Sequence, residues 1–273
     1  MKVAAIQMCS MDDVAANLRA ASRLLMQAAD SGAVLAVLPE NFAFMGAQET
    51  AKLAHAEADG TGTIQDFLAQ TARKLSLWIV AGSVPLAVPG EAGKVYAANL
   101  VYDAQGQRRA RYDKIHLFDV DVPRAGNSER YRESNSIAFG APRAVTVDTP
   151  AGKLGLSVCY DLRFPELYRA LVADGAQILC VPSAFTEKTG EAHWQPLLRA
   201  RAIENQCYVI APGQSGTHPG GRRTWGHSMI INPWGEIVAE QQAEGEGIVL
   251  AEIDCEHQAQ IRASFPSLNH RRL

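Results

Sequence analysis

Short apolar runs alternate along the chain with longer stretches in which apolar and polar residues are mixed. Residues 2–8 are typical of a buried strand, and an aspartate, Asp12 or Asp13, can cap a helix whose apolar residues recur at helical spacing. The dipeptide Ser31-Gly32 ends that helix, and residues 34–38 form the next buried run. The same pattern predicts helices at 64–76, 164–174 and 192–205, and strands at 77–83, 154–159, 177–181, 207–211 and 247–253, with two more strands flanking the turn at 232–235.

The middle of the chain is more typical of antiparallel strands. Residues 99–102 and 107–112 flank a turn that ends in Gly106, which predicts a hairpin. Strands with hairpins and covering helices indicate an α/β fold in which sheets lie between helical layers. Since no Pro/Ser-rich linker or low-complexity run divides the sequence, we expect one domain over residues 1–273.

Composition excludes several classes of protein. The formal net charge is -3 and the isoelectric point is near 6.2, so the chain lacks the basic surface expected of a nucleic-acid-binding protein. No apolar stretch is long enough to cross a bilayer, which argues against a membrane protein. The N-terminus lacks the apolar centre and cleavage site of a signal peptide, so we expect a cytoplasmic location.

The cysteines do not form a disulfide or zinc pattern. Five are present, an odd number without close pairs. Cys9, Cys180 and Cys207 lie in or beside strand-like segments, where a thiol packs as a small apolar group. Cys159 differs, because it ends an apolar run and a polar, arginine-bearing segment follows at once.

A thiol at the end of a strand points to an active site. The carboxyl edge of an open α/β sheet is where such sites form. A sharp turn from strand to helix at Cys159 would also expose the sulfur, with the backbone N–H of Tyr160 facing the oxyanion of a reaction intermediate. A structural role for this thiol stays open on the residue alone.

Glu40 and Lys114 can complete that chemistry. Glu40 directly follows the buried strand at 34–38, and Lys114 follows the hairpin. Taken singly, each is typical of a solvated surface charge. Together with a thiol, the carboxylate can act as a base and the ammonium can stabilise an oxyanion. Spacing alone does not show that the three side chains meet.

Three segments nevertheless resemble, in the right order, the signature blocks of the nitrilase superfamily of carbon–nitrogen hydrolases. They are residues 38–41, 112–118 and 158–166, and the resemblance extends over essentially the whole chain. It implies a catalytic triad of Glu40, Lys114 and Cys159, with Glu133 as a second glutamate. It also implies a four-layer α-β-β-α sandwich, assembly into homodimers, and chemistry that needs neither a metal nor an organic cofactor.

Further segments resemble the Nit-type amidases within this superfamily: residues 132–136, 192–194, 198–204 and 226–229. Residues 205–209 and 269–272 favour the branch of deaminated glutathione amidases. The implied reaction is hydrolysis of a primary carboxamide, on a small substrate that bears carboxylates, to an acid and ammonia through a cysteine thioester. The alternatives are an omega-amidase acting on alpha-ketoglutaramate or succinamate, and a binding protein that keeps the fold without turnover.

The resemblance also implies the residues that hold the substrate. Arg163 is the expected partner of a substrate carboxylate, with an ion pair to Glu166 as the structural alternative. Phe185 and Thr189 match positions that line the pocket in Nit-type relatives, although a packed aromatic ring and a loop hydroxyl would explain them too.

Residues 213–224 contain Pro219-Gly220-Gly221 and are typical of a mobile surface loop. The two arginines of this segment, Arg222 and Arg223, are interpreted first as solvated loop charges and second as groups that attract an acidic substrate. Whether the segment contacts substrate stays open.

Overall fold

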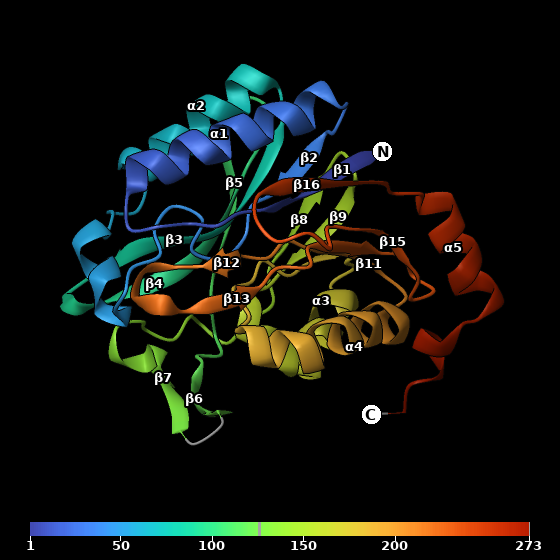
Figure 1. The fold of residues 1–273 in the computed structure, drawn as a ribbon. Helices are drawn as coiled ribbons and strands as arrows, with labels where there is room; N and C mark the ends of the chain where they lie inside the picture. The colour runs from blue at the N-terminus through green and yellow to red at the C-terminus, as the bar shows by residue number, and fades with distance from the viewer. Residues whose placement is uncertain (125–126, 273) are drawn as a thin grey trace.

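Two six-stranded sheets stack face to face in the computed structural model, which describes residues 1–124 and 127–272 (Figure 1). In spatial order, the first sheet contains β16 (Gly247–Glu252), β1 (Lys2–Gln7), β2 (Leu35–Val37), β3 (Trp78–Val88), β4 (Glu91–Tyr102) and β5 (Arg108–Asp113). The second contains β15 (Ile237–Glu240), β14 (Met229–Ile231), β11 (Tyr208–Ala211), β10 (Ile178–Cys180), β9 (Gly152–Leu156) and β8 (Thr146–Thr149).

Helices cover the outer face of each sheet (Figure 1). The first sheet carries α1 (Val14–Asp30) and α2 (Thr63–Leu75), and the second carries α3 (Pro165–Ala173) and α4 (Glu187–Asn205). This arrangement confirms the predicted α-β-β-α sandwich. Among the described residues, no helix is long and apolar enough to cross a membrane.

Both faces of strand β1 are buried, which explains why polar residues do not alternate with apolar ones along it. Successive side chains of a strand point to opposite faces of the sheet. Val3 and Ala5 belong to the core between the two sheets, whereas Ala4 and Ile6 pack in the core under α1 and α2. Because both faces are buried, the strand needs apolar residues throughout.

The central strands of each sheet run parallel, which brings several chain segments to one edge. Strands β1, β2 and β3 pair in parallel, as do β9, β10 and β11. Glu40 follows β2 by three residues, and Cys159 follows β9 by the same number. The topology therefore delivers both residues just beyond the carboxyl ends of parallel strands.

Most predicted elements are present, with different ends. Strand β3 continues to Val88, β4 begins at Glu91, and α4 begins at Glu187, where Thr186 caps it. Strand β9 ends at Leu156, before the predicted end at residue 159. The sequence analysis did not predict the hairpin of β6 (Asp119–Arg124) and β7 (Asn127–Arg132), strand β8, the helix α5 (Cys255–Ser264), or the 3₁₀ segments η1 (Glu49–His55), η2 (Glu133–Asn135), η3 (Cys159–Arg163), η4 (Pro219–Gly221) and η5 (Ser267–His270).

The prediction of a surface loop at 213–224 is wrong. This segment forms most of a hairpin, β12 (Ser215–Thr217) and β13 (Arg223–Trp225), with several polar residues buried against the N-terminal half of the chain. Gln214 donates to the carbonyl of Glu40 at 3.0 Å, and His218 Nδ1 lies 2.8 Å from the carbonyl of Ser10. These contacts join residues about 170 to 210 positions apart, so no local pattern in the sequence could show them.

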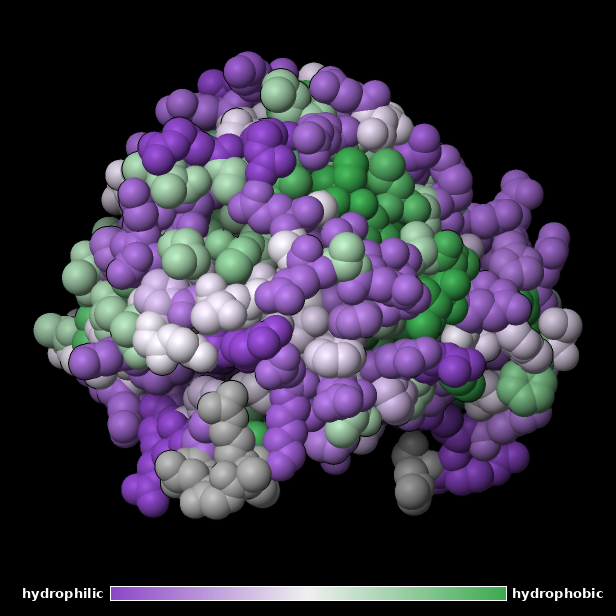
Figure 2. All heavy atoms as spheres, viewed as in Figure 1, coloured by the Kyte–Doolittle hydropathy of each residue, from purple (hydrophilic) through white to green (hydrophobic). Residues whose placement is uncertain are grey.

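Most of the surface seen in Figure 2 is polar, apart from a hydrophobic area over β15 and β16. Within the described residues, Val238 of β15 is exposed, and Trp234, Phe265 and Ile203 are exposed large hydrophobic residues as well. The Trp234 and Phe265 rings lie 6.2 Å apart, so these two side chains form one apolar spot on the surface.

Candidate active site

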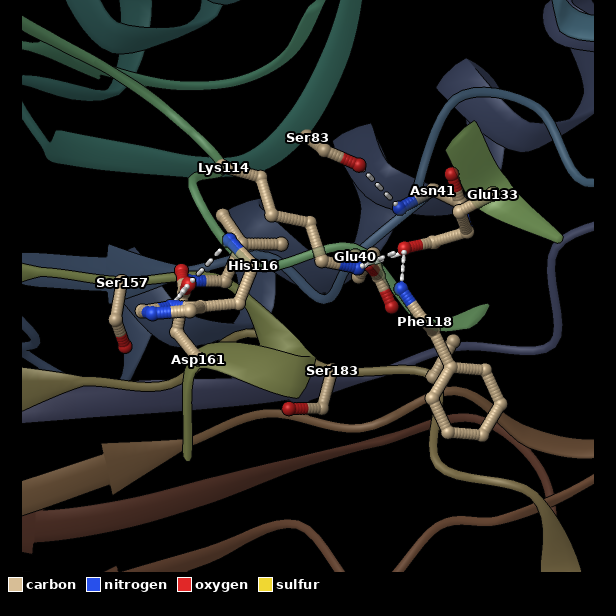
Figure 3. Close-up of polar contacts among 12 residues, drawn as sticks. Glu40, Asn41, Ser83, Lys114, His116, Phe118, Glu133, Ser157, Asp161 and Ser183 are labelled. Atoms are coloured by element: carbon tan, nitrogen blue, oxygen red, sulfur yellow. Dashed lines mark hydrogen bonds and ion pairs between the residues drawn. The ribbon is translucent and has the colours of Figure 1, made fainter. Parts of the chain in front are cut away.

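The structure brings Glu40, Lys114 and Cys159 into one buried site (Figure 3, in which Glu40 and Lys114 are labelled). Lys114 Nζ lies 2.8 Å from Glu40 Oε1. The three residues are 3%, 0% and 8% exposed, so Glu40 and Lys114 are not the solvated surface charges that each resembled alone. They come from loops after β2, β5 and β9, which meet at the same edge of the sandwich.

Glu133 lies on the other side of Lys114. Lys114 Nζ is 3.0 Å from Glu133 Oε1 and 2.8 Å from Oε2, and the Phe118 N–H donates to Oε2 at 2.7 Å (Figure 3). Burial lowers the pKa of Lys114, but the charges of Glu133 and Glu40 outweigh burial and hold that pKa well above its ordinary value. The ammonium ion thus stays charged between two carboxylates.

Lys114 in turn lowers the pKa of Glu133. Burial raises the pKa of the Glu133 carboxyl, but the Lys114 charge more than offsets burial, so the net shift is downward. Both groups are therefore ionised, and they form a hydrogen-bonded, largely buried ion pair.

Cys159 sits on a sharp turn between β9 and η3. Its φ is +48°, in the left-handed region that a side chain with a Cβ adopts at a cost of about 1–3 kcal/mol. The Cys159 N–H donates to the carbonyl of Pro182 at 2.9 Å, which ties the turn to the neighbouring strand end. This is the strand–turn arrangement that the sequence pattern at 154–166 predicted.

The electrostatic surroundings keep the Cys159 thiol protonated. Burial raises its pKa well above the ordinary value of 9.0, and the negative charge of Glu40 raises it further. The Lys114 charge and a hydrogen bond from the backbone of Ala184 lower it, without reversing the net shift. A nucleophilic thiolate therefore requires a base at the moment of attack, and Glu40 is the nearby carboxylate.

Asp161 holds the turn in place. Its Oδ2 accepts from the Val158 N–H at 2.8 Å and the Tyr112 hydroxyl at 2.7 Å. Its Oδ1 accepts from the His116 N–H at 3.1 Å and lies 2.7 Å from His116 Nδ1 (Figure 3). Asp161 thereby connects the turn of Cys159 with the segment that carries Lys114. The sequence analysis assigned it no role, because nothing in a single aspartate indicates four contacts with three residues.

A pocket of about 290 Å³ opens onto these groups. Its walls include every residue that the sequence analysis assigned to the site, apart from Lys114, which lies behind Glu40 and Glu133. The lining residues are Glu40, Phe118, Glu133, Cys159, Tyr160, Arg163, Ala184, Phe185, Thr186, Thr189 and Arg222.

Arg163 faces the pocket rather than its own helix. Its guanidinium lies 5.4 Å from the centre of the Phe185 ring and 5.7 Å from that of Tyr160, and Nη1 is 3.3 Å from His193 Nδ1. Arg163 forms no ion pair with Glu166, the structural alternative, or with any other carboxylate of residues 1–124 and 127–272. Its cation is available to a ligand in the pocket.

Thr189 has both a structural and a pocket position. Its hydroxyl lies 2.8 Å from that of Thr186, and its N–H donates to Thr186 Oγ1 at 3.4 Å as part of the cap of α4.

Phe185 packs against Trp194 with ring centres 4.9 Å apart, so its face toward the pocket is held rigidly.

Arg222 is the pocket residue that the sequence analysis misjudged. The first interpretation, a solvated loop charge, is wrong: Nη1 lies 3.2 Å from Glu49 Oε1, and Nη2 donates to the carbonyl of Ala184 at 3.3 Å. Its neighbour Arg223 fits that interpretation better, since it is exposed and pairs with Glu187 and Glu244.

With this geometry in view, comparison with known proteins decides the family. A model of the carbon–nitrogen hydrolase family matches residues 2–263. The chain is a carbon–nitrogen hydrolase.

Relatives of this carbon–nitrogen hydrolase match it along its length. The deaminated glutathione amidase of Synechocystis sp. is 49% identical over 269 residues, which cover 98% of this chain and 97% of that protein. The NitFhit crystal structure from C. elegans superimposes with a TM-score of 0.91 at 39% identity, covering 99% of this chain and 65% of that one. An amidase from Nesterenkonia sp. AN1, with acrylamide added to its active-site cysteine, has a TM-score of 0.79 at 26% identity, covering 97% and 98%.

The site of this carbon–nitrogen hydrolase is suited to acyl transfer through sulfur. It combines a thiol on a strained turn, a carboxylate able to take its proton, and a buried cation able to stabilise negative charge. Within the described residues, no group of three or more His, Cys, Asp or Glu side chains has the arrangement of a metal site.

Proposed function

We propose that this carbon–nitrogen hydrolase cleaves deaminated glutathione through a thioester on Cys159. The observation that carries the proposal is the buried Lys114, which is shared by Glu40 and Glu133 in the site of Cys159. The substrate follows from the names of the relatives, of which the protein from Synechocystis sp. is 49% identical over nearly all of both chains.

In the first step, the Cys159 sulfur attacks the amide carbon while Glu40 takes the thiol proton. The carbonyl oxygen becomes an oxyanion, which Lys114 Nζ and the Tyr160 backbone N–H stabilise. Glu40 then gives its proton to the amide nitrogen, the C–N bond breaks, and the acyl group remains on sulfur as a thioester. Since the thiol is protonated at rest, the proton transfer to Glu40 is part of the attack.

In the second step, Glu40 takes a proton from water as the water attacks the thioester carbon. A C–O bond forms, the C–S bond breaks, and the proton returns to the sulfur. Glu133 is a positioning residue here: its two oxygens hold Lys114 Nζ at 2.8–3.0 Å. The Lys114 ammonium can therefore direct one N–H toward the oxyanion while Glu133 continues to hold Nζ.

The acyl half of the substrate ends in a 2-oxo acid, which Arg163 binds. A guanidinium can hold a carboxylate through two parallel hydrogen bonds. Phe185 and Thr189 form the adjoining wall, the first with its ring and the second with its hydroxyl. Cys159, Arg163, Phe185 and Thr189 line the same pocket, so one acyl group can contact all of them.

The leaving group of deaminated glutathione is not the ammonia that the resemblance implied. Both amides of deaminated glutathione are secondary, so it holds no primary carboxamide. Hydrolysis of the amide that joins the 2-oxoglutaryl group to cysteine releases 2-oxoglutarate and cysteinylglycine. The nitrogen that Glu40 protonates is therefore the amine nitrogen of cysteinylglycine. Alpha-ketoglutaramate, the omega-amidase substrate, does carry a primary carboxamide and releases ammonia.

The test offers deaminated glutathione and alpha-ketoglutaramate separately to the wild type, to Cys159→Ala and to Cys9→Ala, with 2-oxoglutarate as the common product measured. The expected result is a higher kcat/KM on deaminated glutathione, abolished in Cys159→Ala and retained in Cys9→Ala. A preference for alpha-ketoglutaramate would make the protein an omega-amidase with the same chemistry. Absence of turnover on both substrates would contradict the proposal.

We further propose that the chain acts as one domain, in the cytoplasm, as a homodimer. The exposed apolar residues Ile203, Trp234, Val238 and Phe265 support association with a second copy. Sedimentation of the wild type and of Trp234→Asp tests the dimer: a dimer that becomes a monomer in the variant is expected, and a monomeric wild type would contradict it.

A further inference from the structure

Arg222 lies where the pocket meets a second, larger hollow. It lines both the pocket of Cys159 and an outer groove of about 930 Å³. The other residues of this outer groove come from the segments at 46–49, 129–131 and 219–221. Gly220 and Gly221 on its rim are exposed, so the groove is open to solvent on that side.

The guanidinium of Arg222 is held in place but retains a free donor. Glu49 and the Ala184 carbonyl take one terminal nitrogen each, and the cation lies 5.2 Å from the centre of the Tyr131 ring. Nε is buried, and it has no hydrogen-bond partner in the described part of the chain. An unpaired buried donor is costly, so Nε is poised for an acceptor that the protein does not supply.

Arg222 is also close to the reacting sulfur. Its Nη2 donates to the carbonyl of Ala184, and the backbone of the same Ala184 forms a hydrogen bond to Cys159. Ala184 therefore contacts both the Arg222 guanidinium and the Cys159 thiol. Arg222 and Cys159 also line the same pocket, so one substrate molecule can contact both.

We propose that Arg222 recognises a carboxylate on the leaving-group side of the scissile amide, so that the preferred substrates are amides with a carboxylate at each end. This rests on the proposed function, in which Arg163 takes the acyl-side carboxylate. The acyl group stays on Cys159 in the small pocket, whereas the leaving group has to depart to solvent. The outer groove beyond Arg222 is the open route.

The other charged groups of the groove do not cancel this preference. Glu49 pairs with Lys52 at 3.3 Å as well as with Arg222, so its charge is shared between two cations. Glu129 accepts from the Tyr131 hydroxyl at 2.9 Å, and Arg130 pairs with Asp121. Glu49 is thus a positioning residue that fixes the direction of Arg222.

The test compares deaminated glutathione with its glycinamide form, in which the terminal carboxylate is a neutral carboxamide. The ratio of kcat/KM for the two forms is measured in the wild type, Arg222→Gln, Arg222→Lys and the matched control Arg223→Gln. We expect the wild type to prefer the carboxylate about 10- to 100-fold, the range for hydrogen bonds to a charged group. The ratio should fall to near one in Arg222→Gln, fall partly in Arg222→Lys, and persist in Arg223→Gln.

An equal loss on both forms, which leaves the ratio unchanged, would show a structural role for Arg222 and overturn the inference. A wild type that cleaves neither form overturns the proposed function, and the inference is then decided by binding. In that case the affinities of Cys159→Ala for the two forms are compared by calorimetry. Tighter binding of the carboxylate form by tenfold or more supports the role of Arg222; equal affinity, or no measurable binding, overturns it.

Discussion

Tyr112 donates its hydroxyl hydrogen to Asp161 at 2.7 Å, from the last strand of the first sheet to the turn that follows β9 in the second. Both residues are fully or almost fully buried, at 2% and 0% exposed. Lys114 lies two residues after Tyr112, and Cys159 lies two residues before Asp161. This hydrogen bond therefore fixes the separation of the ammonium ion from the nucleophile, although neither partner faces the pocket.

Replacing Tyr112 with Phe should lower the unfolding free energy by about 1.5–3 kcal/mol, the range for a hydrogen bond to a charged group. The value of kcat/KM should fall as well, because the turn of Cys159 loses an anchor. Urea unfolding and steady-state kinetics measure the two effects. Tyr102→Phe, at another buried tyrosine on β4, is the control and should keep wild-type kinetics. Wild-type stability and kinetics in Tyr112→Phe would show that the other partners of Asp161 suffice.

Replacing Lys114 with Met should leave Glu40 and Glu133 buried without their common cation. Loss of one partner from a buried ion pair costs about 3–5 kcal/mol, and loss of an oxyanion donor lowers kcat about 10²- to 10³-fold. Adding Glu133→Gln removes one of the two unpaired charges, so it should restore part of the stability and none of the activity. If the double variant is less stable than Lys114→Met, the electrostatic explanation is wrong.

The titration of Cys159 should respond to Glu40. Burial and the Glu40 charge raise the pKa of the thiol, so the thiolate forms only above the ordinary value of 9.0. A negative charge disfavours a thiolate, and its removal in Glu40→Gln should move the thiolate absorbance at 240 nm to lower pH. Subtraction of the same titration in a Cys159→Ala background isolates this cysteine. An unchanged midpoint, or a move to higher pH, is incompatible with a carboxylate beside the thiol.

Gly82 supports Glu40 from behind. A Cβ at Gly82 would lie 2.3 Å from the carbonyl oxygens of both Leu38 and Pro39, the backbone that leads to Glu40. Gly82→Ala should therefore displace this segment, lower stability by about 1–3 kcal/mol and reduce kcat. Gly93→Ala is the matched control in the neighbouring strand, because nothing lies within 4 Å of its Cβ. The idea fails if both variants behave alike.

Local patterns in the sequence were enough to predict the layered core. Strands with both faces buried have uninterrupted apolar runs, as in β1, and helix caps have short polar side chains. The sequence left Asp12 and Asp13 as alternatives, and the structure selects Asp13, whose side chain accepts from the Ala16 N–H. Helix α5 escaped prediction because only Gln258 and Ile261 are buried in it, which leaves almost no apolar periodicity.

Site residues could be predicted from the sequence only where they lie in a recognisable motif. Glu40, Lys114 and Cys159 lie in recognisable blocks, whereas Arg222 enters the pocket because the β12–β13 hairpin folds back onto residues near positions 10 and 40. That packing depends on contacts between distant segments. A Gly/Pro-rich segment with two arginines is locally identical to a solvated loop. The partial burial of Arg222 and the exposure of Arg223 therefore could not be predicted from it.

The central claim is that Cys159 carries the acyl group during turnover. The most direct measurement is acid quenching of the enzyme during hydrolysis of deaminated glutathione, followed by mass spectrometry of its peptides, with Cys159→Ala in parallel. We predict a 2-oxoglutaryl adduct on the peptide that contains Cys159, with neither adduct nor product formation in Cys159→Ala. An adduct on a different residue, or hydrolysis at the wild-type rate by Cys159→Ala, would contradict it.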